Sequence, residues 1–227
     1  MTTRKPSNPT FRRDIAFPRH YLRIGILDTP LPMSSGCGVQ PSEPMPFQWS
    51  CHVETESGLF DQFGFLDTRG LDPRRELVET LLAVIARTGA ILVPSARETA
   101  LLHGLHHRLA DSTGALADAL SRLVEVDRFA HQREKPAAPR SVSTDHPAAS
   151  VIWPEDAVDP SPDLRDDRAA QAAYLELIDA RTQNIRRRQL TRALVRYGDR
   201  QLSELVHAFA EHTGGHPASL APGPMPN

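Results

Sequence analysis

A short apolar run between prolines constrains the fold of this chain more than any other stretch. It lies within residues 17–32, FPRHYLRIGILDTPLP, and its apolar and aromatic members are Tyr21, Leu22, Ile24, Ile26 and Leu27. Proline interrupts the hydrogen-bonded ladder of a sheet, so Pro18 marks the start of the run and Pro30 and Pro32 mark its end. Because the run is nearly continuous rather than alternating, it predicts a strand buried on both faces in the centre of a sheet.

Length and composition set the size and charge of the protein. The chain has 227 residues, of which 40% are hydrophobic, and this is enough to bury one sizeable core. We expect a single domain over residues 17–213, with a proline-rich insert at 132–163 and loose tails at 1–16 and 214–227. The net charge of -2 argues against a protein that coats nucleic acid or membranes, although it allows a local basic patch.

Cysteine usage and hydropathy predict a cytoplasmic protein. The two cysteines, Cys37 and Cys51, do not make a disulfide framework or a zinc site. The first ten residues, MTTRKPSNPT, lack the apolar core of a signal peptide. The most apolar stretch, Leu81–Val93, contains Arg87 and is too short to span a bilayer, so no membrane partner is expected.

Periodicity predicts an α/β fold that begins with strands and ends with helices. Alternating residues at 47–54 and 59–66 indicate two strands joined by a hairpin turn at 56–58. The apolar run at 90–93 fits a buried parallel strand that is reached through a crossover helix over 73–87. The other expected elements are helices at 96–109, 113–124, 167–178 and 186–212 and a short strand at 124–129. This order predicts a mixed sheet of three antiparallel strands followed by parallel strands, with a helical C-terminal part.

Three segments carry a resemblance to a known family: PRxYL at 18–22, PFQWS at 46–50 and DPRRELxETLL at 72–82. They resemble segments of a bacterial family of unknown function to which an RNase H-like, DEDD-type exonuclease fold is ascribed. The resemblance implies the RNase H-like version of the mixed sheet. It also implies a site at which acidic residues from three motifs hold two divalent ions that activate water.

This chain lacks most of the acids that the family has at its ion-binding positions. The two carboxylates of the family's first strand correspond to Arg23 and Gly25, and the aspartate of its third motif corresponds to Gln201. Glu98, in the segment VPSARE, is the one acid of the second motif, and Asp127 matches a further family aspartate. The resemblance therefore implies five vestigial active-site positions with no catalytic residue, no bound metal and no cofactor.

A one-residue shift of the first motif leaves an alternative open. It puts Asp28 at the glutamate position, while the leading aspartate position becomes Ile26. A displaced ligand set of Asp28, Glu98 and Asp127 would then bind Mg²⁺ or Mn²⁺.

Two further patterns suggest binding surfaces. His103, His106 and His107 have the helical spacing that could present two imidazoles to zinc, but no Cys, Asp or Glu lies nearby in sequence to complete the ligand shell. We interpret them as surface histidines. Three arginines spaced four residues apart form a basic stripe that could follow a phosphate backbone or simply be solvated: Arg188, Arg192 and Arg196.

Three functions remain open from the sequence. The leading hypothesis is a catalytically degenerate exonuclease-fold protein that binds nucleic acid or protein. The second is an active, metal-dependent 3'-5' exonuclease with the displaced ligands. The third is a remnant without any ligand, in which the insert and the helical half make only protein contacts.

Overall fold

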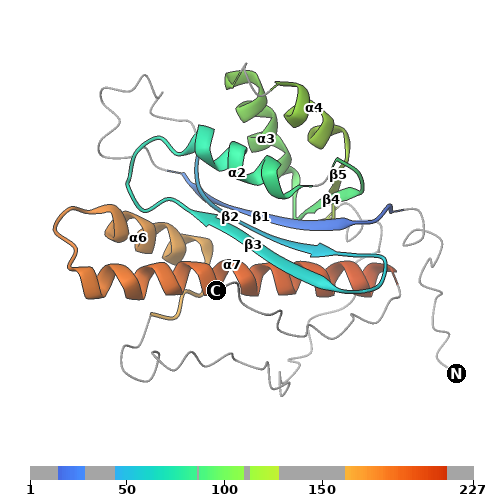
Figure 1. The fold of residues 1–227 in the computed structure, drawn as a ribbon. Coiled ribbons are helices and arrows are strands. Elements are labelled where there is room, and N and C mark those ends of the chain that lie inside the picture. The colour runs from blue at the N-terminus through green and yellow to red at the C-terminus, as the bar shows by residue number, and fades with distance from the viewer. Residues whose placement is uncertain (1–14, 29–43, 86, 110–112, 128–161, 214–227) are drawn as a thin grey trace, which may run out of the picture.

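The computed structural model of the protein describes residues 15–28, 44–85, 87–109, 113–127 and 162–213. Within them the chain forms a mixed α/β structure in which a five-stranded sheet lies between two layers of helices (Figure 1). The predicted α/β class with a mixed sheet is therefore confirmed. The predicted tails and the proline-rich insert fall almost entirely outside the described residues.

The sheet has the strand order β3-β2-β1-β4-β5. Its strands are β1 (Arg19–Leu27), β2 (Met45–Glu54), β3 (Phe60–Leu66), β4 (Ala90–Val93) and β5 (Leu123–Glu125). β1 pairs antiparallel with β2 and parallel with β4, β2 pairs antiparallel with β3, and β4 pairs parallel with β5. The central position predicted for the first strand and the parallel pairing predicted for residues 90–93 are both confirmed.

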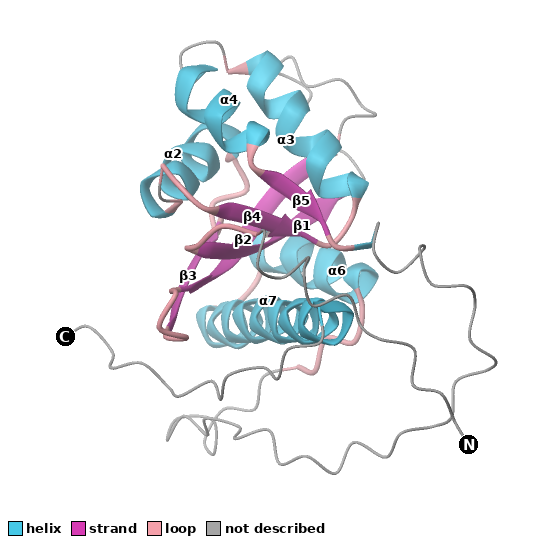
Figure 2. Cartoon of the chain, turned by 90° about the vertical axis from the view of Figure 1, so that its right-hand side faces the viewer, coloured by secondary structure: helices cyan, strands magenta, loops and turns pink. Residues whose placement is uncertain are grey.

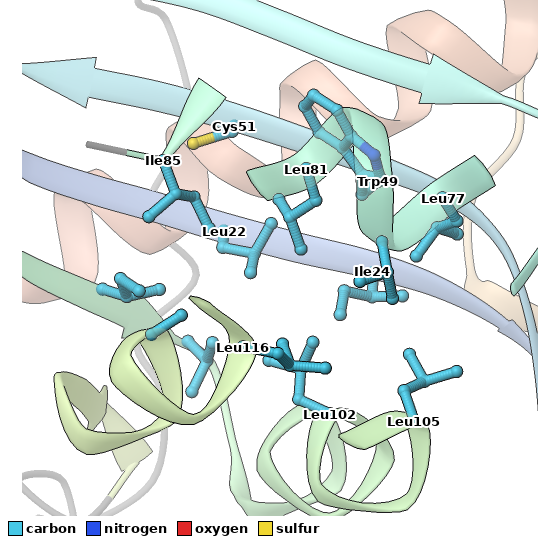
Figure 3. Packing of buried hydrophobic residues seen from close by; sticks show 14 of the residues in the cluster. Leu22, Ile24, Trp49, Cys51, Leu77, Leu81, Ile85, Leu102, Leu105 and Leu116 are labelled. Carbon is cyan, nitrogen blue, oxygen red and sulfur yellow. The ribbon is translucent and has the colours of Figure 1, made fainter. Parts of the chain in front are cut away.

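The two faces of β1 supply different layers of the core, which explains its nearly continuous apolar run. Leu22 and Ile24 point toward α2 (Arg74–Val84), α3 (Ala96–Arg108) and α4 (Thr113–Ser121) on one side of the sheet. Figure 3 shows Leu102 and Leu105 of α3 approaching these two β1 side chains. Tyr21 and Leu27 belong to clusters on the opposite side.

The opposite face is covered by α6 (Asp167–Ile178) and the long helix α7 (Asn184–Thr213), as Figure 2 shows. Two apolar clusters flank the middle of this layer. One joins α6 and the first half of α7 to β2, where the Phe47 and Tyr174 rings stack with centroids 4.3 Å apart. The other joins the second half of α7 to β1 and β4, and Phe209 meets Tyr21 edge-on at 5.8 Å. Between the two clusters, the polar β2 residues Gln48 and Ser50 lie against Gly198 in the middle of α7.

Several predicted boundaries need correction. The helix predicted over 73–87 ends at Val84, because Ile85 already has an extended backbone. Gly89 lies in the turn before β4, with φ +84°, and a Cβ there would lie 2.0 Å from the Pro18 carbonyl oxygen. The helix predicted over 113–124 ends at Ser121, since Leu123 and its neighbours pair with β4 instead.

Two smaller predictions can also be compared with the structure. Cys51 is buried in the core, and burial raises the pKa of its thiol to about 12; Cys37 lies outside the described residues. No helix among the described residues has the length and apolar character that crossing a membrane requires.

Candidate functional site

Arg23, on the central strand, holds two carboxylates that come from distant parts of the chain. Its Nη1 donates a short hydrogen bond to Oε1 of Glu98. Its Nη2 donates to both carboxylate oxygens of Asp167, at 2.9 and 2.8 Å. The Arg23 side chain is only 16% exposed. A single guanidinium therefore bridges α3 and α6 across the carboxyl-terminal half of β1.

Glu98 is delivered by the start of α3, directly after β4. Ser95 caps this helix, because its hydroxyl accepts a hydrogen bond from the Arg97 backbone N–H at 3.2 Å. The same hydroxyl donates to Oε2 of Glu98 at 2.8 Å. Glu98 is fully buried, so both of its oxygens are satisfied by protein donors rather than by solvent.

Asp167 is the first residue of α6, and Tyr197 of α7 fixes its orientation. The Tyr197 hydroxyl donates to Oδ1 of Asp167 at 2.8 Å. The preceding residue, Asp166, caps the helix by accepting from the Ala169 N–H at 2.8 Å. Because Asp166 serves as the cap, the Asp167 carboxylate can face the sheet and accept hydrogen bonds from Arg23.

An outer group of polar side chains surrounds this network at the end of β1. Arg97 donates a short hydrogen bond to Asp28 and lies 4.0 Å from an oxygen of Asp167. Gln171 of α6 donates to Asp28 at 3.0 Å and accepts from its backbone N–H at 3.3 Å. Asp28, the alternative ligand of the sequence analysis, is therefore held by an arginine and an amide.

The pKa shifts of Arg23 and Asp167 favour the charged form of both side chains. Burial alone lowers the pKa of Arg23, but the charges of Glu98 and Asp167 outweigh it and raise the pKa above its usual value. Burial raises the pKa of Asp167. The Tyr197 hydrogen bond and the Arg23 charge lower it by more, so the net shift of this pKa is downward. Burial, followed by the hydrogen bond to Asp167, raises the pKa of Tyr197. Tyr197 is therefore a donor and not a base.

Little space remains beside the guanidinium. The cavity that Arg23, Asp167 and Tyr197 border has a volume of about 20 Å³, roughly enough for one water molecule. At Gly25, a Cβ would lie 3.0 Å from the ring of Phe47, and at Gly198 it would lie 2.3 Å from the Ser50 hydroxyl oxygen. The Gly25 position is thus closed by the core, and α7 crosses the sheet in direct contact with β2.

The structure brings together three of the five vestigial positions. Arg23 contacts Glu98, and Gly25 borders the same small cavity as Arg23. Asp127 is an exposed residue after β5 whose backbone N–H donates to the Pro94 carbonyl at 3.0 Å. Gln201 is half-buried on α7 and donates to Glu204 at 3.0 Å. Among the described contacts, none joins Asp127 or Gln201 to Arg23.

The residues present do not fit a two-metal centre. In the described part of the chain, no three His, Cys, Asp or Glu side chains form a group that could hold a metal ion. The oxygens of Glu98 and Asp167 are turned toward a guanidinium instead. The three histidines of α3 also lie outside any such group: His103 and His107 are exposed and His106 is half-buried.

The arginine stripe of α7 is only partly a surface feature. Arg188 and Arg196 are exposed, whereas Arg192 is half-buried. Nearby, Arg186 is neutralised by Glu176, to which its Nε donates at 2.7 Å. Arg188 and Arg196 therefore offer the more accessible charges of the predicted stripe.

Sequence reasoning missed the roles of Asp167 and Tyr197. Tyr197 is buried on α7, and its hydroxyl reaches Asp167 only because α7 packs beside α6. Asp167 was seen only as the start of a helix. The available signal was the Asp166–Asp167 pair, since an N-cap needs one carboxylate and leaves the next free for another role.

Comparison with known proteins gives one family assignment. The sequence model of a domain of unknown function (DUF2779) matches residues 28–145, just over half of the 227 residues. The chain belongs to the DUF2779 family. The matched DUF2779 region runs from Asp28 through β5 and contains Glu98, whereas Arg23, Asp167 and Tyr197 lie outside it. Neither a curated protein nor a solved structure matches the chain.

Proposed function

We propose that this DUF2779 protein is a non-catalytic binding module built on an RNase H-like exonuclease scaffold. The observation that carries the proposal is the Arg23 guanidinium, which bridges Glu98 and Asp167 at the point where the related exonucleases are expected to hold metal ions. In this proposal the positive charge of Arg23 replaces the charge of a bound metal ion.

The topology supports the scaffold part of the proposal. An RNase H-like sheet needs three antiparallel strands, a crossover helix, a parallel strand, a second helical connection and a last parallel strand. The order β3-β2-β1-β4-β5, with β1 central and Arg23 on it, has this arrangement.

Electrostatics supports the non-catalytic part. A divalent ion placed about 4 Å from the Arg23 charge would be repelled by about 8 kcal/mol at an effective dielectric constant near 20. The two carboxylates that could attract the ion are already paired with the guanidinium. The displaced set of Asp28, Glu98 and Asp127 gains no support, because Asp28 pairs with Arg97 and Asp127 is exposed after β5.

The basic residues of α7 supply the binding surface in this proposal. Arg188, Arg192 and Arg196 would contact the phosphate backbone of a nucleic acid, which requires charge but no catalytic group. Such binding is independent of base sequence and weakens as the salt concentration rises.

Two assays on the purified full-length protein test the proposal. First, labelled single-stranded DNA and RNA are incubated with Mg²⁺ or Mn²⁺, and no shortening of the strands is expected. Second, fluorescence anisotropy of the same oligonucleotides is measured between 50 and 200 mM salt, concentrations across which phosphate contacts lose affinity steeply. We expect weak binding that decreases with salt.

A matched pair of triple variants locates the binding. Replacing Arg188, Arg192 and Arg196 with alanine should abolish binding. Arg75 on α2 and the loop residues Arg165 and Arg181 are exposed outside α7. Replacing these three with alanine changes the net charge equally and should leave most of the binding. Strand cleavage that Asp28→Ala abolishes would overturn the non-catalytic proposal. The absence of any nucleic-acid binding would instead favour a protein partner.

A further inference from the structure

A second and larger cavity lies on the other side of the sheet end, against α3. Its volume is about 260 Å³, compared with about 20 Å³ for the cavity beside Arg23. One face of α3 forms its longest wall, with residues three and four positions apart: Arg97, Ala100, Leu101, Gly104, Leu105 and Arg108. Ile26 at the end of β1, Pro44 before β2 and Arg74 at the start of α2 complete the lining.

The charged groups of this lining are all arginines. Arg97 and Arg108 stand at the two ends of the α3 face, and Arg74 comes from the facing helix. No Asp or Glu is among the described residues that border the cavity. The described lining is therefore electropositive, and its charge complements an anion.

The carboxylates that pair with Arg74 and Arg97 lie outside the described lining of the cavity and are solvent-accessible. Asp72 accepts from Nη1 of Arg74 at 3.0 Å, and its side chain is 38% exposed. Asp28 accepts from Arg97, and its side chain is 55% exposed. A guanidinium has five N–H donors, so Arg97 can keep Asp28 and still donate to a second anion.

The middle of the cavity is apolar and is kept open by small residues. Leu105 and Ile26 are buried, and Leu101 is half-buried. Gly104 has no neighbouring atom within 4 Å of where a Cβ would stand. Glycine weakens a helix relative to alanine, and no close approach of another segment requires it here. Gly104 therefore leaves space between Arg97 and Arg108, which stand at the two ends of this α3 face.

We propose that this cavity binds a small organic anion: a carboxylate or phosphate head group on an apolar body, about ten non-hydrogen atoms in all. The arginines hold the head group, and the Leu101, Leu105 and Ile26 side chains contact the body. Sites for small molecules commonly combine such an apolar wall with a few placed polar groups. This inference does not depend on nucleic-acid binding by α7.

The test is a thermal-shift titration of the full-length protein with four probes. Octanoate and octyl phosphate carry the two head groups on the same body, octanol lacks the charge, and inorganic phosphate lacks the body. A saturable rise in Tm is expected with octanoate, octyl phosphate or both, and which of them acts identifies the head group. Octanol and inorganic phosphate at equal concentration should produce no comparable rise.

Two glycine variants provide the structural control. Gly104→Leu fills the cavity and should abolish the rise. Gly114→Leu places the same side chain on α4, where the Cβ also has open space, and should keep it. Arg108→Gln, which leaves the cavity open, should weaken the affinity for the anions at least threefold. No rise with either anion, an equal rise with octanol, or an unchanged response of both Gly104→Leu and Arg108→Gln would overturn the proposal.

Discussion

Replacing Arg23 with methionine should destabilise the protein far more than the loss of an ordinary surface ion pair. Methionine keeps much of the length of the side chain but removes the charge that Glu98 and Asp167 share. Glu98 is fully buried, so the variant leaves a buried carboxylate without its cation. Removing one partner of a buried pair typically costs about 3–5 kcal/mol.

The two halves of the network should contribute unequally. The Asp167 side chain is 42% exposed, and solvent therefore screens its pairing with Arg23, which we expect to be worth less than about 1 kcal/mol. Most of the loss should come from Glu98. The double variant Arg23→Met, Glu98→Gln should accordingly regain most of the stability, because no buried charge is left unpaired.

Urea unfolding at pH 7, followed by circular dichroism, measures these differences. The control is Arg186→Met, which removes a cation from Glu176 where both side chains are more than 40% exposed. We expect the control to cost less than about 1 kcal/mol. The reasoning fails if Arg23→Met costs no more than the control, or if Glu98→Gln does not rescue it.

Three further predictions concern the middle of the sheet and its helix layer. Burial lowers the pKa of His52 to about 4, so folding favours its neutral form. Stability should therefore fall as pH drops from about 6.5 toward 4. In His52→Phe, the Tm should depend less on pH over that range. Burial raises the pKa of Asp199 to about 6, so folding favours its protonated form. Stability should therefore fall as pH rises through 6. Asp199→Asn should raise the Tm at pH 8 and leave it nearly unchanged at pH 4. Gly25→Ala should cost about 1–3 kcal/mol in urea unfolding, because its Cβ would press on Phe47, and a neutral effect would show that the ring has room to move.

The local pattern of the sequence was sufficient for most helices and strands. The boundaries of α6 are those predicted, because Ala170, Tyr174 and Leu177 bury one stripe of the helix. The end of α2 was predicted too late, since the apolar spacing continues past Val84. The helix ends because the backbone is already extended at Ile85, a change of conformation that periodicity does not report.

The site was less predictable than the fold. Arg23 and Glu98 are 75 positions apart, and only the family resemblance singled them out together. Asp167 was missed because its role depends on how α6 packs over the sheet end and on which of two adjacent acids caps the helix. Acids placed at residues 23, 25 and 201 would restore the acidic pattern of the resembling family. The contact of Gly25 with Phe47 and the position of Gln201 beside Glu204 make Arg23 alone the better target.

The most direct test of the idea that Arg23 replaces a metal ion is a Mn²⁺ titration of the wild type and of Arg23→Asp, followed by Tm. The substitution would place a third carboxylate beside Glu98 and Asp167 and remove the repelling charge. An ion at 100 times its Kd stabilises the native state by about 2.7 kcal/mol. For a protein of this size that corresponds to a Tm rise of roughly 5–10 °C. We predict this rise for Arg23→Asp and no rise for the wild type. A saturable rise in the wild type that Glu98→Gln removes would contradict the account.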